Sequence, residues 1–438
     1  MRQSRHVTDA EGAAIFRSNP GKQNQRRGDP CRTGEIKLRK CRGQQKSAND
    51  GQKSSRPCTG KNLFQRCESF AAIQFRRKRS GARTARPRVL HDGSYPADMR
   101  TGRPRSDLNL RRTLRAFNLA AFYLMQTVSL GKSSLKTSRL AFGLWRIAGT
   151  PSSTGVPPEN RAAARRAIIA AMESGYTLFD NAEVYGGGEC ERILGDAFKE
   201  ISGLRERVVL ATKCGIRPAG QPNSNSPARY DFSADYILAA CNASLKRLRT
   251  DVIDLYMLHR PDFLADPDEI AEAFSQLHRA GKVRFFGVSN FRPTLLTALQ
   301  RSCPMPLVVN QIEISLAKLD AFTDGTLDQC LAEKISPMAW SPLAGGLLGD
   351  GAKKLLPAQQ TYRPEKFLPV LDAIAQERGV IRPVVALSWL LKHPSKIIPV
   401  VGSTNPERIR EAAKADELEL TRDEWYRLLL AARGEPLP

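Results

Sequence analysis

The sequence lacks a long apolar run. Its 438 residues contain no uninterrupted apolar stretch of the roughly 18 residues that a membrane span requires. We therefore do not expect an integral membrane protein. The length is enough for two or three domains, or for a single α/β barrel with a further segment.

Paired cysteines are also lacking. The nine cysteines form no C-x-x-C pair, and five of them, an odd number, follow residue 124. This pattern disfavours both a disulfide framework and a zinc site. We therefore expect reduced thiols, no bound metal and a cytoplasmic location.

Acidic residues are scarce in the first quarter of the chain. Residues 1–124 hold 29 of the 68 basic residues but only 9 of the 44 acidic ones, so they carry most of the formal net charge of +24. Residues 1–107 show no sustained apolar period and cannot bury enough apolar surface to offset chain entropy. We predict that residues 1–124 are a disordered basic extension.

Other interpretations of this extension stay open beside a solvated tail. The basic run at residues 75–80 could contact nucleic-acid phosphates, but regular interleaved aromatics are missing and we expect no nucleic-acid partner. Arg111 and Arg112 precede a short apolar run as in an export signal, yet more than a hundred residues come before them. A start of translation placed too far upstream of Met125 would also account for the extension.

From Met125 onward, β-like runs alternate with helical patterns. The eight β-like runs are residues 140–145, 177–180, 208–213, 252–259, 283–289, 307–311, 335–340 and 397–401. The helical patterns include residues 160–174, 190–199, 233–248, 267–280, 292–300, 327–333, a doubled stretch at 365–392, and 406–415. Eight such units predict a (β/α)₈ TIM barrel over residues 125–438. Residues 128–140 are predicted to form a short hairpin across its bottom.

Several motifs of other enzyme classes are missing. An open doubly wound sheet would normally carry G-x-G-x-x-G after its first strand, and the sequence has no such spacing. The G-x-S-x-G elbow of serine hydrolases and the H-E-x-x-H pair of metalloenzymes are missing as well. These absences favour the barrel and disfavour both of those hydrolytic chemistries.

Polar residues close the predicted strands, where the active site of a barrel lies. Asp180 and Tyr185 follow the second strand, Lys213 ends the third and His259 ends the fourth. These residue types suit proton donation to a carbonyl oxygen, because a buried ammonium at Lys213 would lower the pKa of Tyr185. Asp180 would hold the lysine in place, and His259 would donate or relay a hydrogen bond to the same oxygen.

Together with their neighbours, these residues form motifs that resemble the aldo/keto reductase superfamily. The motifs are F-D-N-A-E-V-Y-G at 179–186, L-A-T-K at 210–213, L-H-R-P-D at 258–262, G-K-V-R-F-F-G-V-S-N-F at 281–291, N-Q at 310–311 and A-W-S-P-L at 339–343. The resemblance runs from about residue 128 to 425 and points to a bacterial oxidoreductase branch. It implies a catalytic tetrad of Asp180, Tyr185, Lys213 and His259, with Tyr185 as general acid in reduction and general base in oxidation.

The resemblance also implies NADP(H) lying across the barrel mouth. The matching positions are Ser289, Asn290 and Gln311 for the carboxamide, Trp340 for the nicotinamide ring, Ser341, Leu343 and Gly345 for the pyrophosphate, and Gly402, Ser403, Thr404, Arg408 and Glu411 for the adenosine 2′-phosphate corner. A helix start after strand eight would offer free backbone N–H groups to that phosphate, and Arg408 could add a bidentate contact. Gly402 departs from the family, where many members have a cation, and Ala412 stands where many have Asn.

The sequence thus predicts NADPH-dependent, reversible reduction of a small-molecule aldehyde or ketone by a monomer or weak homo-oligomer. Two alternatives stay open: a slow-turnover NADP-binding redox sensor or regulatory subunit, and a nucleic-acid-binding protein that uses the basic extension. We expect the loops at residues 214–229 and 344–364 to shape the substrate pocket.

Overall fold

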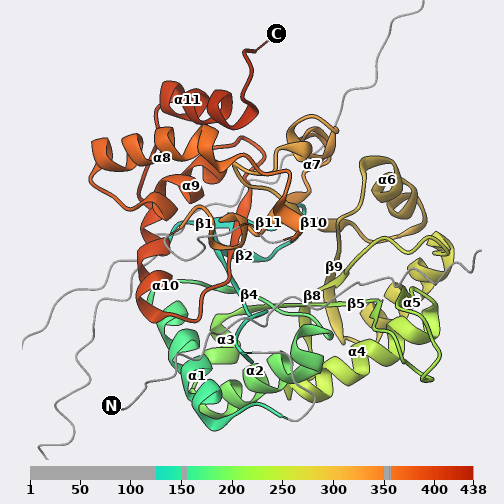
Figure 1. The fold of residues 1–438 in the computed structure, drawn as a ribbon. Helices are drawn as coiled ribbons and strands as arrows, with labels where there is room; N and C mark the ends of the chain where they lie inside the picture. The colour runs from blue at the N-terminus through green and yellow to red at the C-terminus, as the bar shows by residue number, and fades with distance from the viewer. Residues whose placement is uncertain (1–124, 150–154, 350–354, 356, 438) are drawn as a thin grey trace, which may run out of the picture. The chain divides into compact units, whose positions relative to one another are not determined.

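The computed structural model describes residues 125–149, 155–349, 355 and 357–437 (Figure 1). The basic extension predicted for residues 1–124 lies outside these residues. The described strands include a closed, parallel, eight-stranded barrel, so the predicted (β/α)₈ fold is confirmed. Its strands are β3 (Ala141–Gly143), β4 (Leu178–Asp180), β5 (Val209–Cys214), β8 (Ile253–Leu258), β9 (Val283–Ser289), β10 (Leu307–Glu313), β11 (Ser336–Trp340) and β12 (Ile398–Val401). The barrel closes where Val400 and Val401 pair with Ala141 and Phe142.

The helices follow the sequence pattern closely. They are α1 (Pro158–Glu173), α2 (Glu189–Glu200), α3 (Leu204–Arg207), α4 (Ala234–Leu248), α5 (Pro267–Arg279), α6 (Pro293–Ser302), α7 (Thr326–Glu333), α8 (Pro364–Arg378), α9 (Arg382–Leu391), α10 (Pro406–Ala413) and α11 (Arg422–Arg433). The predicted doubled helix is divided at Gly379, whose φ of 63° ends α8. The sequence analysis missed α11, although Thr421 and Glu424 form a capping box at its start.

A hairpin closes the N-terminal end of the barrel, as predicted. Its strands are β1 (Thr127–Ser129) and β2 (Lys136–Ser138), and Leu130 between them is fully buried among the residues that fill the barrel. The N–H of Gly131 donates to Ser336 Oγ across 2.8 Å. Gly131 has a φ of 51°, and a Cβ there would lie 2.5 Å from the Val308 carbonyl oxygen, so this close approach requires glycine.

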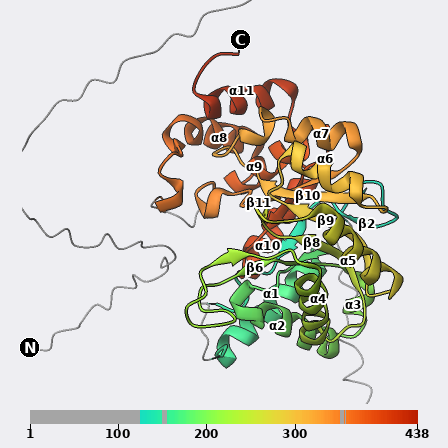
Figure 2. The ribbon, with the colours of Figure 1, turned by 90° about the vertical axis from the view of Figure 1, so that its right-hand side faces the viewer.

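Apolar helix faces cover the outside of the barrel. Figure 2 shows α4 and α5 along the same side of it, and both views place α8 beside α11. Between α8 and α11, Arg378 donates two hydrogen bonds to the carboxylate of Glu424, which lowers the pKa of Glu424 to about 2. Nearby, the rings of Trp389 and Trp425 stack with centroids 5.2 Å apart. Helix α11 is therefore held to α8 and α9 by both charge and aromatic packing.

Candidate active site

The four residues of the predicted tetrad meet at the C-terminal end of the barrel. Asp180 ends β4, Lys213 lies near the end of β5, and His259 directly follows β8. Tyr185 begins η1 (Tyr185–Gly188), whose three glycines all have positive φ and turn the chain sharply into α2. The rings of Tyr185 and His259 meet edge to face, with centroids 5.6 Å apart. Parallel strand ends thus bring Asp180 and His259, 79 positions apart in the sequence, to one place.

Lys213 stands at the centre of this group. Its side chain is fully buried, and Nζ lies 2.8 Å from Asp180 Oδ1. Nζ also donates to the backbone oxygen of Asn181 at 2.7 Å and to the hydroxyl oxygen of Tyr185 at 3.1 Å. An ammonium has three protons, and these three acceptors use them all. Because the Tyr185 oxygen accepts from Lys213, its own proton is left to donate to another group.

The pKa of Tyr185 differs from the expectation. Burial raises the pKa of the phenol above its ordinary value, and the charge of Lys213 opposes this rise without reversing it. The lowering by Lys213 is as predicted, but the pKa still lies above its ordinary value, because desolvation of the phenolate outweighs the attraction of one ammonium. Burial also disfavours the charge of Lys213, but Asp180 and Tyr185 together raise its pKa. At neutral pH the site accordingly holds a protonated tyrosine beside a charged lysine.

His259 is neutral in this environment. Burial lowers its pKa well below the ordinary value, and the charges of Lys213 and Arg260 lower it further. Its Nδ1 is buried and has no hydrogen-bond partner among the described residues. A neutral imidazole has one N–H donor and one acceptor nitrogen, so His259 can donate a hydrogen bond at the barrel mouth without carrying charge.

The residues predicted to hold a carboxamide lie beside the tetrad. Asn290 Nδ2 donates to the His259 carbonyl oxygen at 3.1 Å and to Ser289 Oγ at 2.8 Å. Asn290 Oδ1 accepts from Trp340 Nε1 at 2.9 Å. Gln311 Nε2 donates to Asp180 Oδ1 at 2.9 Å, whereas Gln311 Oε1 accepts no hydrogen bond from a described residue. These residues therefore form a connected polar network in which the side-chain oxygen of Gln311 is available to accept a hydrogen bond from an amide N–H.

The loop after β11 offers backbone donors. Ser341 and Gly345 have positive φ values of 49° and 67°. The N–H groups of Leu343 and Gly345 donate no hydrogen bond within the part of the chain that the structure describes. A Cβ on Gly345 would lie 2.8 Å from Gln359 Nε2. Free N–H groups on a backbone with left-handed turns can bind phosphate oxygens, so this loop fits a pyrophosphate.

The corner after β12 is less open than predicted. Pro406 has no N–H, and the side chain of Asn405 already accepts from the N–H groups of Glu407 and Arg408 at 2.8 and 3.2 Å. The expectation of free N–H groups at the start of α10 is wrong, because a good N-cap residue occupies the position where an anion would bind.

Of the other residues of this corner, Ser403 and Glu411 are half-buried and Gly402 is exposed. Ser403 Oγ accepts from the Asn405 N–H, and Glu411 accepts from Lys414 Nζ at 2.7 Å. A Cβ on Gly402 would meet no atom within 4 Å. Thr404 is half-buried and Arg408 is exposed. Any anion held here would depend on side chains rather than on the helix start.

Two charged residues at the C-terminal end of the barrel were not among the site residues predicted from the sequence. Arg260 places its guanidinium 5.3 Å from the centre of the Trp340 ring, and it forms no hydrogen bond or ion pair with a described residue. Glu313 ends β10 and accepts from the Tyr362 hydroxyl at 2.9 Å. Their position directly after buried strand residues was the signal that could have identified them.

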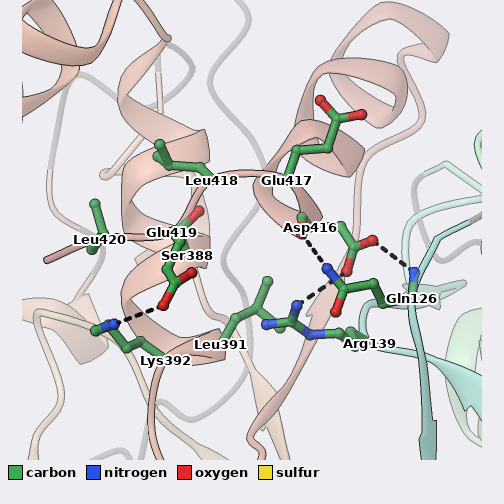
Figure 3. Close-up of a pocket in the computed structure, with 10 residues that line it drawn as sticks. All are labelled: Gln126, Arg139, Ser388, Leu391, Lys392, Asp416, Glu417, Leu418, Glu419 and Leu420. Carbon is green, nitrogen blue, oxygen red and sulfur yellow. Dashed lines mark hydrogen bonds and ion pairs between the residues drawn. The ribbon is translucent and has the colours of Figure 1, made fainter.

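A cavity of about 360 Å³ lies at the opposite end of the barrel (Figure 3). The N–H of Gln126 donates to Asp416 Oδ2 at 2.7 Å, and Arg139 lies 3.5 Å from the same carboxylate. Figure 3 shows these side chains directed toward one another. None of the predicted site residues lines this cavity. Its polar groups hold the segment before β1 against the residue 416 turn, which is a structural role.

The described residues contain neither a cluster suited to a metal ion nor a helix suited to a membrane. Within residues 125–149, 155–349, 355 and 357–437, no group of three or more His, Cys, Asp or Glu side chains could hold a metal ion. None of the helices in this part of the chain is long and apolar enough to cross a membrane.

Comparison with known proteins connects this geometry to a family. A sequence model of the Aldo/keto reductase family matches residues 139–429. The chain is 42% identical over 315 residues to the 6-dehydroglucose reductase of Novosphingobium aromaticivorans, a match that covers 70% of this chain and 96% of that protein. It is 41% identical over 312 residues to the 6-dehydroglucose reductase of Agrobacterium fabrum, with 71% and 99% covered.

A solved structure is similar as well. The glycerol dehydrogenase of Gluconobacter oxydans superposes with a TM-score of 0.62 and 28% sequence identity, covering 71% of this chain and 97% of that one. The predicted resemblance is confirmed.

Proposed function

The chain belongs to the aldo/keto reductase family of oxidoreductases, and from that premise we propose that it reduces an aldehyde or ketone to the alcohol with NADPH, reversibly. The observation that carries the proposal is the hydrogen bond from Lys213 Nζ to the Tyr185 oxygen. It directs the phenolic proton away from the lysine, toward the place where a carbonyl oxygen would lie. NADPH, when bound, supplies the hydride.

Tyr185 is the proposed general acid. Burial keeps its phenol protonated at neutral pH, and the nearby Lys213 ammonium stabilises the phenolate that forms as the proton leaves. Asp180 lies against Lys213 and offsets the cost of burying its charge. In the reverse direction the same phenolate would take the proton from an alcohol.

His259 is the proposed second donor to the reacting oxygen. Its neutral state, supported by the low pKa, lets it donate a hydrogen bond without competing with Tyr185 for the proton. Two donors converging on one oxygen stabilise the charge that develops there during hydride transfer.

The proposed cofactor contacts follow the polar network. Gln311 Oε1, with Ser289 and Asn290 beside it, would receive the carboxamide, and Trp340 would stack on the nicotinamide ring. The N–H groups of Leu343 and Gly345, near Ser341, would bind the pyrophosphate. Arg408, with Gly402, Ser403, Thr404 and Glu411 around it, would receive the 2′-phosphate end, which is the basis for proposing NADPH over NADH.

A hydroxylated aldehyde is the proposed substrate class. Arg260 has donors without hydrogen-bonded partners among the described residues, and Glu313 adds an acceptor at the same mouth. Hydroxyl groups both donate and accept, so they can satisfy both side chains. Two relatives named 6-dehydroglucose reductase support this choice.

The experiment is a panel of aldehydes and ketones with purified protein and NADPH, followed by absorbance of the cofactor. Steady turnover that is faster with glyceraldehyde than with propanal is the expected result. A single turnover with no steady rate on any carbonyl would instead favour a slow redox sensor.

A further inference from the structure

We propose that Glu183 is a positioning residue, which fixes the loop bearing Tyr185 to the end of β5 so that the tyrosine hydroxyl stays on Lys213. Glu183 lies two residues before Tyr185, in the turn that leaves β4. This inference rests on the proposed role of Tyr185. It adds a residue that touches neither the reacting oxygen nor the cofactor in the proposed mechanism.

The backbone of Glu183 makes the first connection. Its N–H donates to the carbonyl oxygen of Lys213 at 3.0 Å. Two residues earlier, the N–H of Asn181 donates to the carbonyl oxygen of Ala211 at 2.9 Å. These bonds continue the pairing of β4 with β5 into the turn, so the chain approaching Tyr185 follows the strand that carries Lys213.

The side chain of Glu183 makes the second connection, to the backbone two residues after Lys213. The N–H of Gly215 donates to Glu183 Oε1 at 2.7 Å. Gly215 has a φ of 108°, and a Cβ there would lie 2.0 Å from the ring of Phe232. Only glycine allows the backbone to present its N–H in this way. Glu183 therefore binds the residues on both sides of Cys214, and the carbonyl of Lys213 is one of its two backbone partners.

A third bond extends the arrangement to α4. The Tyr236 hydroxyl donates to the same Glu183 Oε1 at 2.9 Å. Arg217 lies over the Tyr236 ring at 4.4 Å and pairs with Asp231 at 3.2 Å. Arg217 belongs to β6 (Ile216–Arg217), which pairs with β7 (Arg229–Tyr230) in the loop expected to shape the substrate pocket. Glu183 thus joins the tyrosine loop to that substrate loop.

The charged groups around Glu183 come from several elements. The pKa of Glu183 is raised to about 7 by the sum of these groups: burial raises it most, the Gly215 N–H and the Tyr236 hydroxyl lower it, Glu191 of α2 raises it and Arg247 of α4 lowers it. Both protonation states keep an oxygen that can accept from Gly215 and Tyr236. The positioning role therefore depends on the acceptor oxygen rather than on the charge.

This distinction defines the test. Glu183→Met fills the space but has no acceptor oxygen, whereas Glu183→Gln keeps one. Misplacing a catalytic group by about 1 Å can cost on the order of 100-fold in rate. We expect Glu183→Met to lower kcat at least about tenfold, with KM for NADPH within about threefold of wild type. We expect Glu183→Gln to retain kcat within about threefold.

Asp254→Asn is the matched control. Asp254 is a buried carboxylate at the other end of the barrel, where it accepts from the Leu210 N–H and pairs with Arg205 and Arg284. We expect this variant to lower the melting temperature and to leave kcat unchanged. A fall in kcat in both Glu183→Met and Asp254→Asn would show a general loss of structure and overturn the proposal.

The remaining outcomes separate this inference from the proposed function. Full activity of Glu183→Met would overturn positioning while leaving carbonyl reduction intact. Equal losses in Glu183→Met and Glu183→Gln would overturn it too, because they would show that the charge matters. If wild type reduces no carbonyl, the proposed function fails, and the inference fails with it.

A second variant covers the case in which Glu183→Met does not fold. Tyr236→Phe keeps the ring and removes one donor, and we then expect kcat to fall about threefold or more with KM for NADPH unchanged. Unchanged kcat in this variant would overturn the proposal.

Discussion

Lys213 donates a hydrogen bond to the hydroxyl oxygen of Tyr185 across 3.1 Å, and not the reverse. This direction matters because burial raises the pKa of the tyrosine despite the adjacent ammonium. The lysine does not make the phenol acidic in the resting protein. In the proposed reaction it lies where the phenolate would form, so its stabilising effect would be largest as the proton leaves.

The first prediction concerns the proton of Tyr185. Tyr185→Phe keeps the ring and removes the only group proposed to deliver the proton, so carbonyl reduction should fall at least roughly 100-fold. NADPH affinity, measured by quenching of tryptophan fluorescence, should stay within about twofold because the substitution removes no proposed cofactor contact. Activity within about tenfold of wild type would disprove the assignment.

The second prediction concerns the cofactor phosphate. A charge-assisted contact from Arg408 to the 2′-phosphate would contribute about 1.5–3 kcal/mol, or roughly ten- to hundredfold in affinity. NADPH should therefore bind more tightly than NADH, and Arg408→Ala should weaken NADPH binding by this factor while leaving NADH unaffected. Titration of each cofactor against both proteins gives the comparison. Equal losses for the two cofactors would mean that Arg408 does not contact the 2′-phosphate.

The third prediction concerns stability and pH. The folded protein holds the proton of Glu183 with a pKa of about 7, above the ordinary value of 4.5. The folded state therefore binds this proton more tightly than the unfolded state, and stability falls as pH rises from about 4.5 to 7.

Glu183→Gln carries no charge and escapes this loss. Its melting temperature should exceed that of wild type at pH 8, and the difference should shrink at pH 5. Thermal melts at the two pH values provide the measurement. A constant difference, or a larger one at pH 5, would contradict the assigned pKa.

The fourth prediction concerns residues 1–124. The family match begins at residue 139, and the side chain of Met125 is buried in the core of the barrel. A protein starting at Met125 should keep the melting temperature and kcat/KM of the full chain, because the sequence of residues 1–107 has no apolar periodicity with which to add to a core. Aggregation of the shorter protein, or a loss of more than a few degrees, would show that the first quarter belongs to the fold.

The sequence by itself determined the barrel fold and which residues lie at the C-terminal end of the barrel. Alternating strand and helix periods require parallel strands, and parallel strands place their C-terminal ends together. Asp180, Lys213 and His259 could therefore be assigned to one site without coordinates, since each follows or ends a buried run. The hairpin under the barrel was predictable for the same reason, from local pattern and turn residues.

Only the tertiary structure decided how these groups behave. The direction of the Tyr185 pKa depends on how deeply the phenol is buried, and burial is set by elements far apart in the sequence. The sequence predicts an anion site at the start of α10, but in the structure the side chain of Asn405 caps this helix. The sequence motif gives no role to Glu183. Its role is visible only in the fold, where Gly215 and Tyr236 both donate to its side-chain oxygen. Local pattern specifies which residues gather, whereas desolvation and hydrogen-bond partners arise from packing between distant segments.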